Sequence, residues 1–364
     1  MMKKTWEDYW FACIEGIAST KKMKIHERIN ISELFHIEEI GVELKEQGII
    51  SEKELDRINA SRGKRDWEVE FSKAKEKGIK VITYFDECYP NRLKQHSGMP
   101  YALFLKGQLI EETKKTVAIV GARRSSAYGE TMTLEFAEAL CEQGIQIVSG
   151  MALGIDSLAH RAALNKNGIT NAVLGCGVDV CYPKENKGLY LDLQTKGGII
   201  SEYPPGTIPL ARHFPARNRI ISGLADYVLV MEAKEKSGSL ITADMALEQG
   251  KDIYALPGPV DKELSKGCNR LIYQGAGILL SPDILLEDLG FSYKALEKDC
   301  ENKIMLESKE ELVYSCLGLV PKNREEIMRE TNLEPSELAM ILMDLELKGL
   351  ITERSKNYYL RRKR

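Results

Sequence analysis

The chain has 364 residues, of which 43% are hydrophobic and 29% charged, and its formal net charge is −3. This length favours two or three globular domains, while apolar runs such as VAIV and YVLVM fall far short of the roughly 18 residues that a membrane span needs. Because nucleic-acid-binding domains usually carry a net positive charge, the composition does not predict one here, and a bound anion must be held by a local arrangement of residues.

Two further global features narrow the class of protein. The N-terminus, MMKKTWEDYWF, lacks the apolar core of a secretory signal, so we expect a cytoplasmic protein. The eight cysteines form no CxxC pair and do not cluster with the five histidines. We therefore expect reduced thiols, with no disulfide framework and no metal site.

Residues 1–76 are charge-dense, and their apolar residues recur with helical periodicity between glycines. No strand-like run interrupts them, which predicts a small helical domain.

From residue 77 short apolar runs alternate with amphipathic segments that often end in glycine. After IKVITYF the series runs TVAIVG, EFAEALCEQG, IQIVSG, SLAHRAALNKNG, TNAVLG and on to DIYALPG. The strands are nearly continuous apolar runs, as expected of parallel strands buried on both faces. Residues 77–290 are therefore predicted to form an α/β domain around a doubly wound parallel sheet.

The C-terminal part divides into a connector and a third domain. Residues 291–305 are polar and charged, which predicts a linker. Residues 306–364 indicate three helices and a short hairpin, ITERSKNYYLRRKR, as in a winged-helix module. From Arg354 onward the tail carries six basic residues and no acidic one.

Doubly wound sheets bind ligands at the carboxyl ends of their strands, so the loops after the strands are the candidate sites. GARRSSAYG combines a turn glycine with Arg123, Arg124 and Ser126 just before a predicted helix. Backbone N–H groups and a guanidinium together suit a phosphate, although the loop is neither G-x-G-x-x-G nor a P-loop. A turn with exposed arginines is an equally good interpretation.

Two more loops offer small residues where a ligand could approach the backbone. SGMALGIDSLAH contains Gly150 and Asp156, and the simplest role of Asp156 is to cap the following helix. KEKSGSLITA suits an anion at a helix start, although serine-rich caps are also common without a ligand. Its candidate residues are Ser237, Gly238, Ser239 and Thr242.

The segment HFPARNR precedes the apolar run YVLVM and holds the strongest cluster. Together with the preceding Arg212, Arg217 and Arg219 can meet phosphate oxygens, and Asn218 can meet a phosphate or a base edge. Phe214 offers a face for a stacked base, a combination that suits single-stranded nucleic acid. The alternative is that the Phe214 ring plugs the core beneath a bent loop.

Few residues of the sequence fit a known catalytic motif. No G-x-S-x-G elbow and no H-E-x-x-H occurs. Glu202 follows a strand and could act as a base, but a role in holding its loop is favoured. The motifs alone therefore assign no catalytic residues and no cofactor.

Taken in order, VGARRSSAYG, VSGMALGID, AVLGCGVDVCYP, GGIISEYPPG, FPARNRIISGL, SGSLITA, PGPV and GCNRLIYQGA resemble the DNA-processing protein A (DprA/Smf) family over about residues 80–285. Ala122 stands where many members have serine. The resemblance implies an extended Rossmann-like fold, together with N-terminal helices of sterile-alpha-motif or helix-hairpin-helix type and a C-terminal winged helix.

The resemblance also implies a function. Such proteins are dimeric, bind single-stranded DNA without turnover, protect incoming DNA during natural transformation and load the recombinase RecA onto it. Arg123 would match the family's phosphate-contacting arginine. Phe214 and the triplet from Arg217 to Arg219 would line the DNA pocket, with the SGS loop and Gly150 shaping its floor.

Two alternatives come from other classes. A related Rossmann-like fold hydrolyses nucleoside monophosphates with a motif like P-G-G-x-G-T-x-x-E, where this chain has SGSLITADMALE. A regulatory protein built on the winged helix is the third class, because of the basic tail.

Overall fold

The computed structural model describes residues 4–291, 308–318 and 321–361. The chain divides into two compact units, Met1–Arg124 with Thr133–Leu285, and Ser125–Met132 with Leu286–Arg364. The predicted linker, 291–305, lies outside the described residues except for Phe291.

The larger unit is built on a nine-stranded sheet in the order β1-β2-β6-β5-β4-β3-β7-β8-β9. Along this spatial order, all neighbouring strands between β6 and β9 pair in parallel. Strand β2 pairs antiparallel with both β1 and β6. The predicted doubly wound parallel sheet is confirmed, and an antiparallel pair extends one edge. The strands are β1 Lys80–Thr83, β2 Ala102–Gly107, β3 Thr116–Val120, β4 Gln146–Ser149, β5 Thr170–Val173, β6 Gly198–Ser201, β7 Tyr227–Val230, β8 Asp252–Ala255 and β9 Gly277–Ile278.

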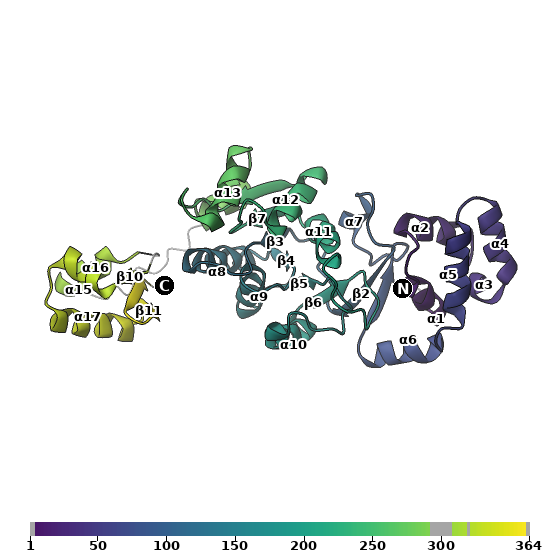
Figure 1. Cartoon of the computed structure of the whole chain (residues 1–364), viewed down its shortest axis with the longest axis horizontal. Coiled ribbons are helices and arrows are strands. Elements are labelled where there is room, and N and C mark those ends of the chain that lie inside the picture. Colours follow the sequence, from purple (N-terminus) through teal and green to yellow (C-terminus); the bar gives the residue numbers. More distant parts are fainter. Residues whose placement is uncertain (1–3, 292–307, 319–320, 362–364) are drawn as a thin grey trace. The chain divides into compact units, whose positions relative to one another are not determined.

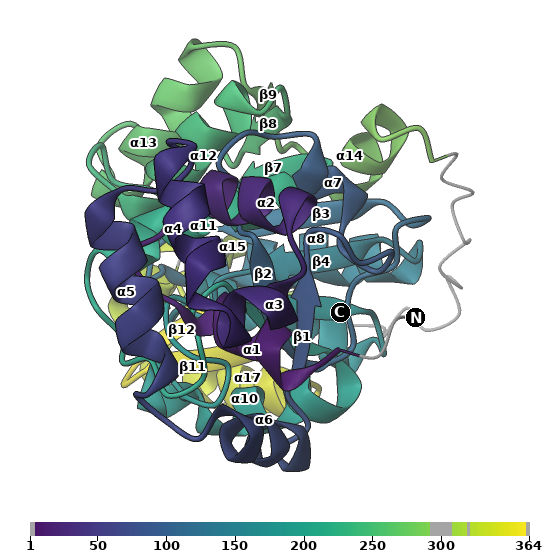
Figure 2. The ribbon, with the colours of Figure 1, turned by 90° about the vertical axis from the view of Figure 1, so that its right-hand side faces the viewer.

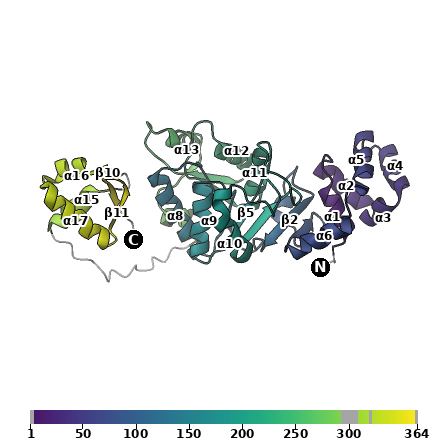
Figure 3. The same cartoon turned by 60° about the horizontal axis from the view of Figure 1, so that its bottom comes forward.

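Helices cover both faces of this sheet (Figure 1, Figure 3). Helices α11 and α12 bury Ile221 and Ala243 against strand residues such as Val228, while α9 and α10 pack on the other face. No helix among the described residues is long and apolar enough to cross a membrane. Between β1 and residue 290 the helices are α7 Asn91–Lys94, α8 Ala127–Glu142, α9 Ile155–Asn165, α10 Lys187–Lys196, α11 His213–Leu224, α12 Gly238–Glu248, α13 Glu263–Tyr273 and α14 Pro282–Asp288, with a 3₁₀ turn, η1, at Lys184–Asn186.

The N-terminal residues form helices, as predicted, and Figure 2 shows them near the β1–β2 edge of the sheet. Their core is continuous with one face of that sheet. The ring centroids of Tyr9 and Phe104 lie 6.1 Å apart, and those of Phe11 and Tyr101 lie 5.3 Å apart. These helices therefore belong to the same compact unit as the sheet. They are α1 Trp6–Cys13, α2 Ser19–Arg28, α3 Ile31–His36, α4 Glu38–Glu46, α5 Glu52–Arg62 and α6 Trp67–Glu76.

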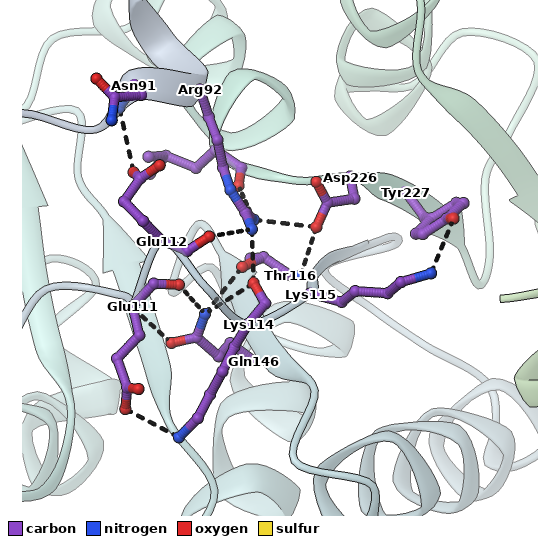
Figure 4. A network of polar contacts seen from close by, with 11 residues as sticks. Asn91, Arg92, Glu111, Glu112, Lys114, Lys115, Thr116, Gln146, Asp226 and Tyr227 are labelled. Atoms are coloured by element: carbon purple, nitrogen blue, oxygen red, sulfur yellow. Dashed lines mark hydrogen bonds and ion pairs between the residues drawn. The ribbon is translucent and has the colours of Figure 1, made fainter. Parts of the chain in front are cut away.

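A polar network fastens the amino ends of β3, β4 and β7 (Figure 4). The Arg92 guanidinium is 3.0 Å from the Asp226 carboxylate and also donates to the carbonyl oxygens of Glu112 and Lys114. Asp226 in turn accepts the N–H of Thr116 at 2.8 Å. The ends of the strands opposite to the predicted site are therefore held by charge-assisted hydrogen bonds.

The smaller unit contains the predicted winged helix, which is confirmed. Three helices surround an apolar core that includes Val313, Ile327 and Leu342, beside a three-stranded sheet in the order β10-β12-β11. Arg361 of the basic tail lies over the Tyr314 ring, 4.2 Å from its centroid, and residues 362–364 fall outside the described residues. The elements are α15 Ser308–Cys316, β10 Lys322–Asn323, α16 Arg324–Thr331, α17 Pro335–Leu347, β11 Ile351–Ser355 and β12 Tyr358–Arg361.

Candidate nucleic-acid interface

A pocket of about 580 Å³ opens beyond the carboxyl ends of β3 and β7, the strands at which the order of the sheet reverses. Such a reversal is where doubly wound sheets bind ligands. The loop after β3, the loop after β7 and one face of α11 supply most of the pocket wall. The predicted residues in its lining are Arg123, Phe214, Arg217, Asn218, Ser237, Gly238, Ser239 and Thr242.

Arg217 forms the floor of the pocket and is only 5% exposed. Its Nη1 donates to the Gly150 carbonyl oxygen at 2.9 Å and also to the carbonyl oxygen of Val173. Burial lowers the pKa of Arg217 to about 10, and the nearby Asp156 carboxylate opposes that shift. The guanidinium therefore stays charged at neutral pH. Two backbone carbonyl groups already occupy part of the hydrogen-bonding capacity of Arg217.

Asp156 does not cap α9, contrary to the sequence interpretation. It lies inside the first turn, and Gly154 holds the N-cap position. Its Oδ2 instead accepts the backbone N–H groups of Gly150 at 3.1 Å and Ala152 at 3.4 Å. Burial raises the pKa of Asp156, while Arg217 and these N–H groups act in the opposite direction. Asp156 and Arg217 together fix the loop after β4.

Gly150 lies beneath the pocket, where no side chain fits. A Cβ there would stand 2.6 Å from Nη2 of Arg217 and 2.7 Å from Oδ2 of Asp156. Gly154, at φ +74°, lets the loop after β4 approach the loop after β3, because a Cβ at this position would come within 2.4 Å of the Ala122 carbonyl oxygen. The small residues of SGMALGID thus allow charged side chains and a neighbouring loop to approach the backbone.

Phe214 is half-buried and forms part of the pocket wall. The Tyr182 ring lies 5.4 Å from the Phe214 ring, tilted by 35°, and the Arg123 guanidinium carbon lies 5.9 Å from the Phe214 centroid. A Cβ at Gly175 would stand 3.0 Å from Cδ1 of Phe214, so that glycine makes room for the ring. Phe214 is thus held in place by its neighbours and also lines the pocket.

The start of α12 forms the opposite wall. The Ser237 Oγ accepts the Ser239 N–H and shares a 2.7 Å hydrogen bond with the Ser239 hydroxyl. Asn218 joins this loop to α11 by donating to the Gly238 carbonyl oxygen at 3.3 Å. The first N–H groups of a helix carry partial positive charge, so this wall suits an anion.

Arg219 does not converge with the other predicted residues. Its guanidinium forms a two-pronged ion pair with Glu202, at 2.8 and 2.5 Å, and donates to the Gly98 carbonyl oxygen. Residues two apart on a helix point about 200° apart, so Arg217 and Arg219 cannot face the same pocket. The sequence interpretation favours a Glu202 that holds its loop by accepting backbone hydrogen bonds, whereas both carboxylate oxygens accept from the Arg219 guanidinium.

Four other predicted residues also lie outside the lining, one of which is Gly150, described above as packed against Arg217 and Asp156. Arg124 is exposed, and Arg212 lines a different pocket. The Ser126 hydroxyl accepts the Gly129 N–H at 3.2 Å in the first turn of α8.

Sequence reasoning missed Lys236 and Tyr182, which line the pocket. Lys236 stands directly before the SGS loop, so its charge was a usable signal. Tyr182 comes from a distant loop, and no local pattern connects it with Phe214. Among the described residues no group of His, Cys, Asp and Glu suits a metal ion. The pocket therefore combines three cations and a helix start with two aromatic rings.

Family comparisons agree with this geometry. The family described as DNA recombination-mediator protein A matches residues 80–290, and the DprA winged helix domain matches residues 302–355. The chain belongs to the DprA/Smf family. The resemblance inferred from the loop motifs is therefore confirmed.

Curated DprA relatives match most of the same region. Protein Smf of Escherichia coli (strain K12) is 40% identical over 278 residues, which cover 74% of each chain. The DNA processing protein DprA of Streptococcus pneumoniae is 46% identical over 210 residues, or 58% of this chain and 74% of that protein.

Two solved DprA structures share the fold. The X-ray structure of the Streptococcus pneumoniae protein covers 80% of this chain and 100% of its own, with a TM-score of 0.68 and 35% identity. A structure of the Helicobacter pylori protein, described in terms of its single-stranded DNA binding mode, covers 58% and 95%, with a TM-score of 0.54 and 31% identity.

Proposed function

We propose that this DprA-family chain binds single-stranded DNA in the pocket between β3 and β7, without enzymatic turnover. The observation that carries the proposal is the placement of Arg123, Arg217 and the α12 start around the half-buried Phe214 ring. Cations that meet phosphates, beside a ring on which a base can stack, bind a single strand without reading its sequence. The Helicobacter pylori relative, described by its single-stranded DNA binding mode, supports this choice of ligand.

The charge of the pocket supports the same ligand. Arg123, Lys236 and Arg217 line it, and Asp156 is the only carboxylate among the described lining residues. Asp156 is paired with Arg217 through space and accepts two backbone N–H groups. Arg123 and Lys236, which are exposed, then leave a local excess of positive charge in a chain whose net charge is −3.

The nucleoside-monophosphate hydrolase alternative needs a carboxylate free to act on the glycosidic bond. Asp156 is buried and occupied by its N–H donors, and Glu202 is held by Arg219. Both observations favour binding without cleavage. Release of free base from nucleotides incubated with the full chain, followed by chromatography, would overturn the non-enzymatic part of the proposal.

Binding is tested by fluorescence anisotropy with labelled oligo-dT over a range of salt concentrations. We expect Arg123→Ala to lower the slope of log K against log[salt] by about 0.7, the effect of one lost phosphate contact on a single strand. Arg124→Ala is the matched control, because Arg124 is exposed beside Arg123 but does not line the pocket. Equal slopes for the parent and Arg123→Ala would place the DNA elsewhere.

The base-stacking role of Phe214 is tested in the same titration. Phe214→Ala should weaken oligo-dT binding by about 5- to 150-fold, which corresponds to a stacked base worth about 1–3 kcal/mol. The salt slope should stay the same, since no charge is lost. A slope that changes while the affinity at low salt does not would contradict stacking.

The biological role follows from the family and goes further than the pocket. We infer a cytoplasmic homodimer that protects incoming DNA during natural transformation and loads RecA onto it. The match to the DNA recombination-mediator protein A family supports this role. Its test is RecA-dependent ATP hydrolysis on single-stranded DNA coated with a single-strand-binding protein, where the chain should shorten the lag before hydrolysis. An unchanged lag would contradict RecA loading.

A further inference from the structure

A second pocket, of about 530 Å³, lies between the N-terminal helices and the loop that follows β6. Lys22 and Ser19 of α2 line it on one side, and Tyr203, Arg212 and His213 line it on the other. All of these residues belong to the same compact unit. The described lining residues of this pocket and of the first pocket do not overlap.

Lys22 is the unusual feature of the second pocket, because a buried lysine normally has a carboxylate partner. Its residue exposure is 6%, and its Nζ donates to the Ala12 carbonyl oxygen at 3.0 Å. The Nζ also lies 5.6 Å from the Phe11 ring centroid and 5.8 Å from that of Tyr101. No carboxylate of the described residues lies within ion-pair distance of Lys22, and the exposed Glu15 of the same pocket acts on its charge only through space. An ammonium carries three N–H donors, so the chain leaves capacity for an anion.

The other groups in this pocket favour a nucleotide over a simple anion. The Tyr203 and His213 rings are stacked, with centroids 4.0 Å apart and planes 20° apart. Arg212 is exposed, with no ion pair among the described residues, and adds a second cation. Glu202 is neutralised by Arg219, which leaves the exposed Glu15 as the remaining carboxylate among the described lining residues.

The two pockets share a wall that is a single stretch of chain. Ile208, Leu210 and Arg212 line the second pocket, whereas Pro209 and Ala211, which alternate with them, line the first. At the end of this stretch His213 lines the second pocket and its neighbour Phe214 lines the first. A DNA strand that extends from the Phe214 ring therefore needs to cross only this stretch of chain, past Arg212, to reach Lys22.

We propose that the second pocket is an additional subsite for the same DNA strand, in which Lys22 and Arg212 bind a phosphodiester beside the stacked rings of Tyr203 and His213. This inference rests on the proposed function of the first pocket and extends its footprint onto the N-terminal helices. A short strand fills the first pocket alone, and a longer one fills both.

The test compares labelled oligo-dT strands of about 6 and about 16 nucleotides, within the usual range of single-strand site sizes. Lys22→Met keeps the apolar stem against the Phe11 and Tyr101 rings but removes the charge. We expect it to leave binding of the short strand unchanged and to lower the salt slope for the long strand by about 0.7. Arg212→Ala should do the same. Lys24→Met, an exposed lysine on the same helix outside the pocket lining, is the control and should behave as the parent.

The outcomes separate this inference from the proposed function. If the parent binds both strands, Arg123→Ala weakens both and Lys22→Met changes neither slope, the subsite is wrong and the first pocket stands. If Arg123→Ala changes neither strand's affinity or slope, the first pocket is wrong, and this inference falls with it.

A second measurement uses the unaltered chain, so it does not depend on a variant that folds. Arg212 lines the second pocket and is exposed, so its guanidinium can react with an arginine-directed dicarbonyl reagent. The long strand should protect Arg212 from modification, as read by mass spectrometry, and the short strand should not. Equal protection by thymidine monophosphate would identify a mononucleotide site instead and overturn the shared-strand proposal.

Discussion

Arg217 and Arg219 are separated by one residue, yet their surroundings differ in kind. Arg217 lies under the candidate DNA pocket and donates to the Gly150 carbonyl oxygen, whereas Arg219 is paired with Glu202. A partly buried guanidinium with a two-pronged carboxylate partner is a structural element more than a free phosphate ligand. The same residue type in one motif therefore serves two purposes.

This difference predicts the effect of removing the Arg219 charge. Arg219→Met should lower the free energy of unfolding by about 1.5–3 kcal/mol, the usual value of hydrogen bonds to charged groups, and leave oligo-dT affinity unchanged. Urea unfolding and anisotropy measure the two effects. Glu202→Gln completes a double-mutant cycle, in which the two substitutions should be coupled. An unchanged stability with a reduced salt slope would return Arg219 to the DNA site.

His160 is a fully buried neutral histidine beneath the same site. Thr170 donates its hydroxyl proton to the Ile147 carbonyl oxygen, so the His160 Nδ1–H donates to the Thr170 oxygen at 2.7 Å. Its Nε2 is buried without a partner in the described structure. Burial, together with the charge of Arg217, lowers the pKa of His160 to about 3.

A histidine of this kind makes stability depend on pH. Between about pH 6.5 and pH 3 the imidazole is protonated in the unfolded chain but neutral in the folded chain. The free energy of unfolding therefore falls as the pH falls through this window. Between pH 7 and pH 5 the loss from His160 should be about 2 kcal/mol. The His160→Asn variant keeps an N–H donor for Thr170. Its free energy of unfolding, measured with urea, should fall by about 2 kcal/mol less than that of the parent over the same pH interval. Equal pH dependence of parent and variant would contradict a neutral buried imidazole.

At the scale of elements, helix α11 organises the pocket through its phase. Phe214, Arg217, Asn218 and Ile221 all line the pocket, and their spacing of i, i+3, i+4 and i+7 is one face of a helix. The sequence alone predicts the series of strands and glycine turns and hence the edge of the sheet where these residues gather. It also contains the phase, which separates Arg219 from Arg217 once HFPARNR is assigned to a helix.

Other features of the fold were beyond the sequence for physical reasons. The antiparallel pairing of β1 and β2 with β6 depends on long-range contacts that no local periodicity encodes. The approach of Tyr182 to Phe214 and of Lys22 to Tyr101 is likewise set by tertiary packing. Close-approach glycines such as Gly150 were visible as small residues, but the side chains that need the space were not.

Strand β9 leaves an unpaired edge in the sheet of the larger unit, and apolar side chains gather beside it. Tyr273 is 92% exposed and Leu280 63% exposed, and Ile278 and Ile284 are also exposed. Within the larger unit no described strand pairs with the outer edge of β9, and such a sheet edge with an apolar border favours association. We propose this edge as the contact of the expected homodimer.

The dimer contact is tested by sedimentation. Leu280→Glu and Tyr273→Glu should convert the dimer into a monomer, because each buries a charge in the apolar contact. Leu191→Glu is the control, since Leu191 is exposed on α10, which packs at the other end of the sheet. A dimer that survives both substitutions would exclude this edge.

At the scale of the whole molecule, the N-terminal helices share a core with the sheet, and the winged helix has its own. Removal of residues 1–76 would expose Phe104 and Tyr101, whose rings pack against Tyr9 and Phe11. We expect residues 77–364 to lose cooperative thermal unfolding and to aggregate, because a large apolar face becomes exposed.

Truncation at the other end should have little effect on the larger unit. A chain that ends at residue 290 should unfold at the same temperature as that unit in the parent and still bind oligo-dT. Calorimetry and anisotropy measure both properties. Cooperative unfolding of residues 77–364 at the parent temperature, or loss of binding by residues 1–290, would contradict this division.

The central claim, that single-stranded DNA occupies the pocket between β3 and β7, is tested most directly by photo-crosslinking. Oligonucleotides that carry one iodouracil each, at successive positions, are irradiated with the full chain, and the linked peptides are identified by mass spectrometry. Bases stacked in this pocket should link to peptides that contain Phe214 or Tyr182. Links confined to the winged helix, at Tyr314 or Tyr358, would contradict the account and favour a winged-helix DNA-binding protein instead.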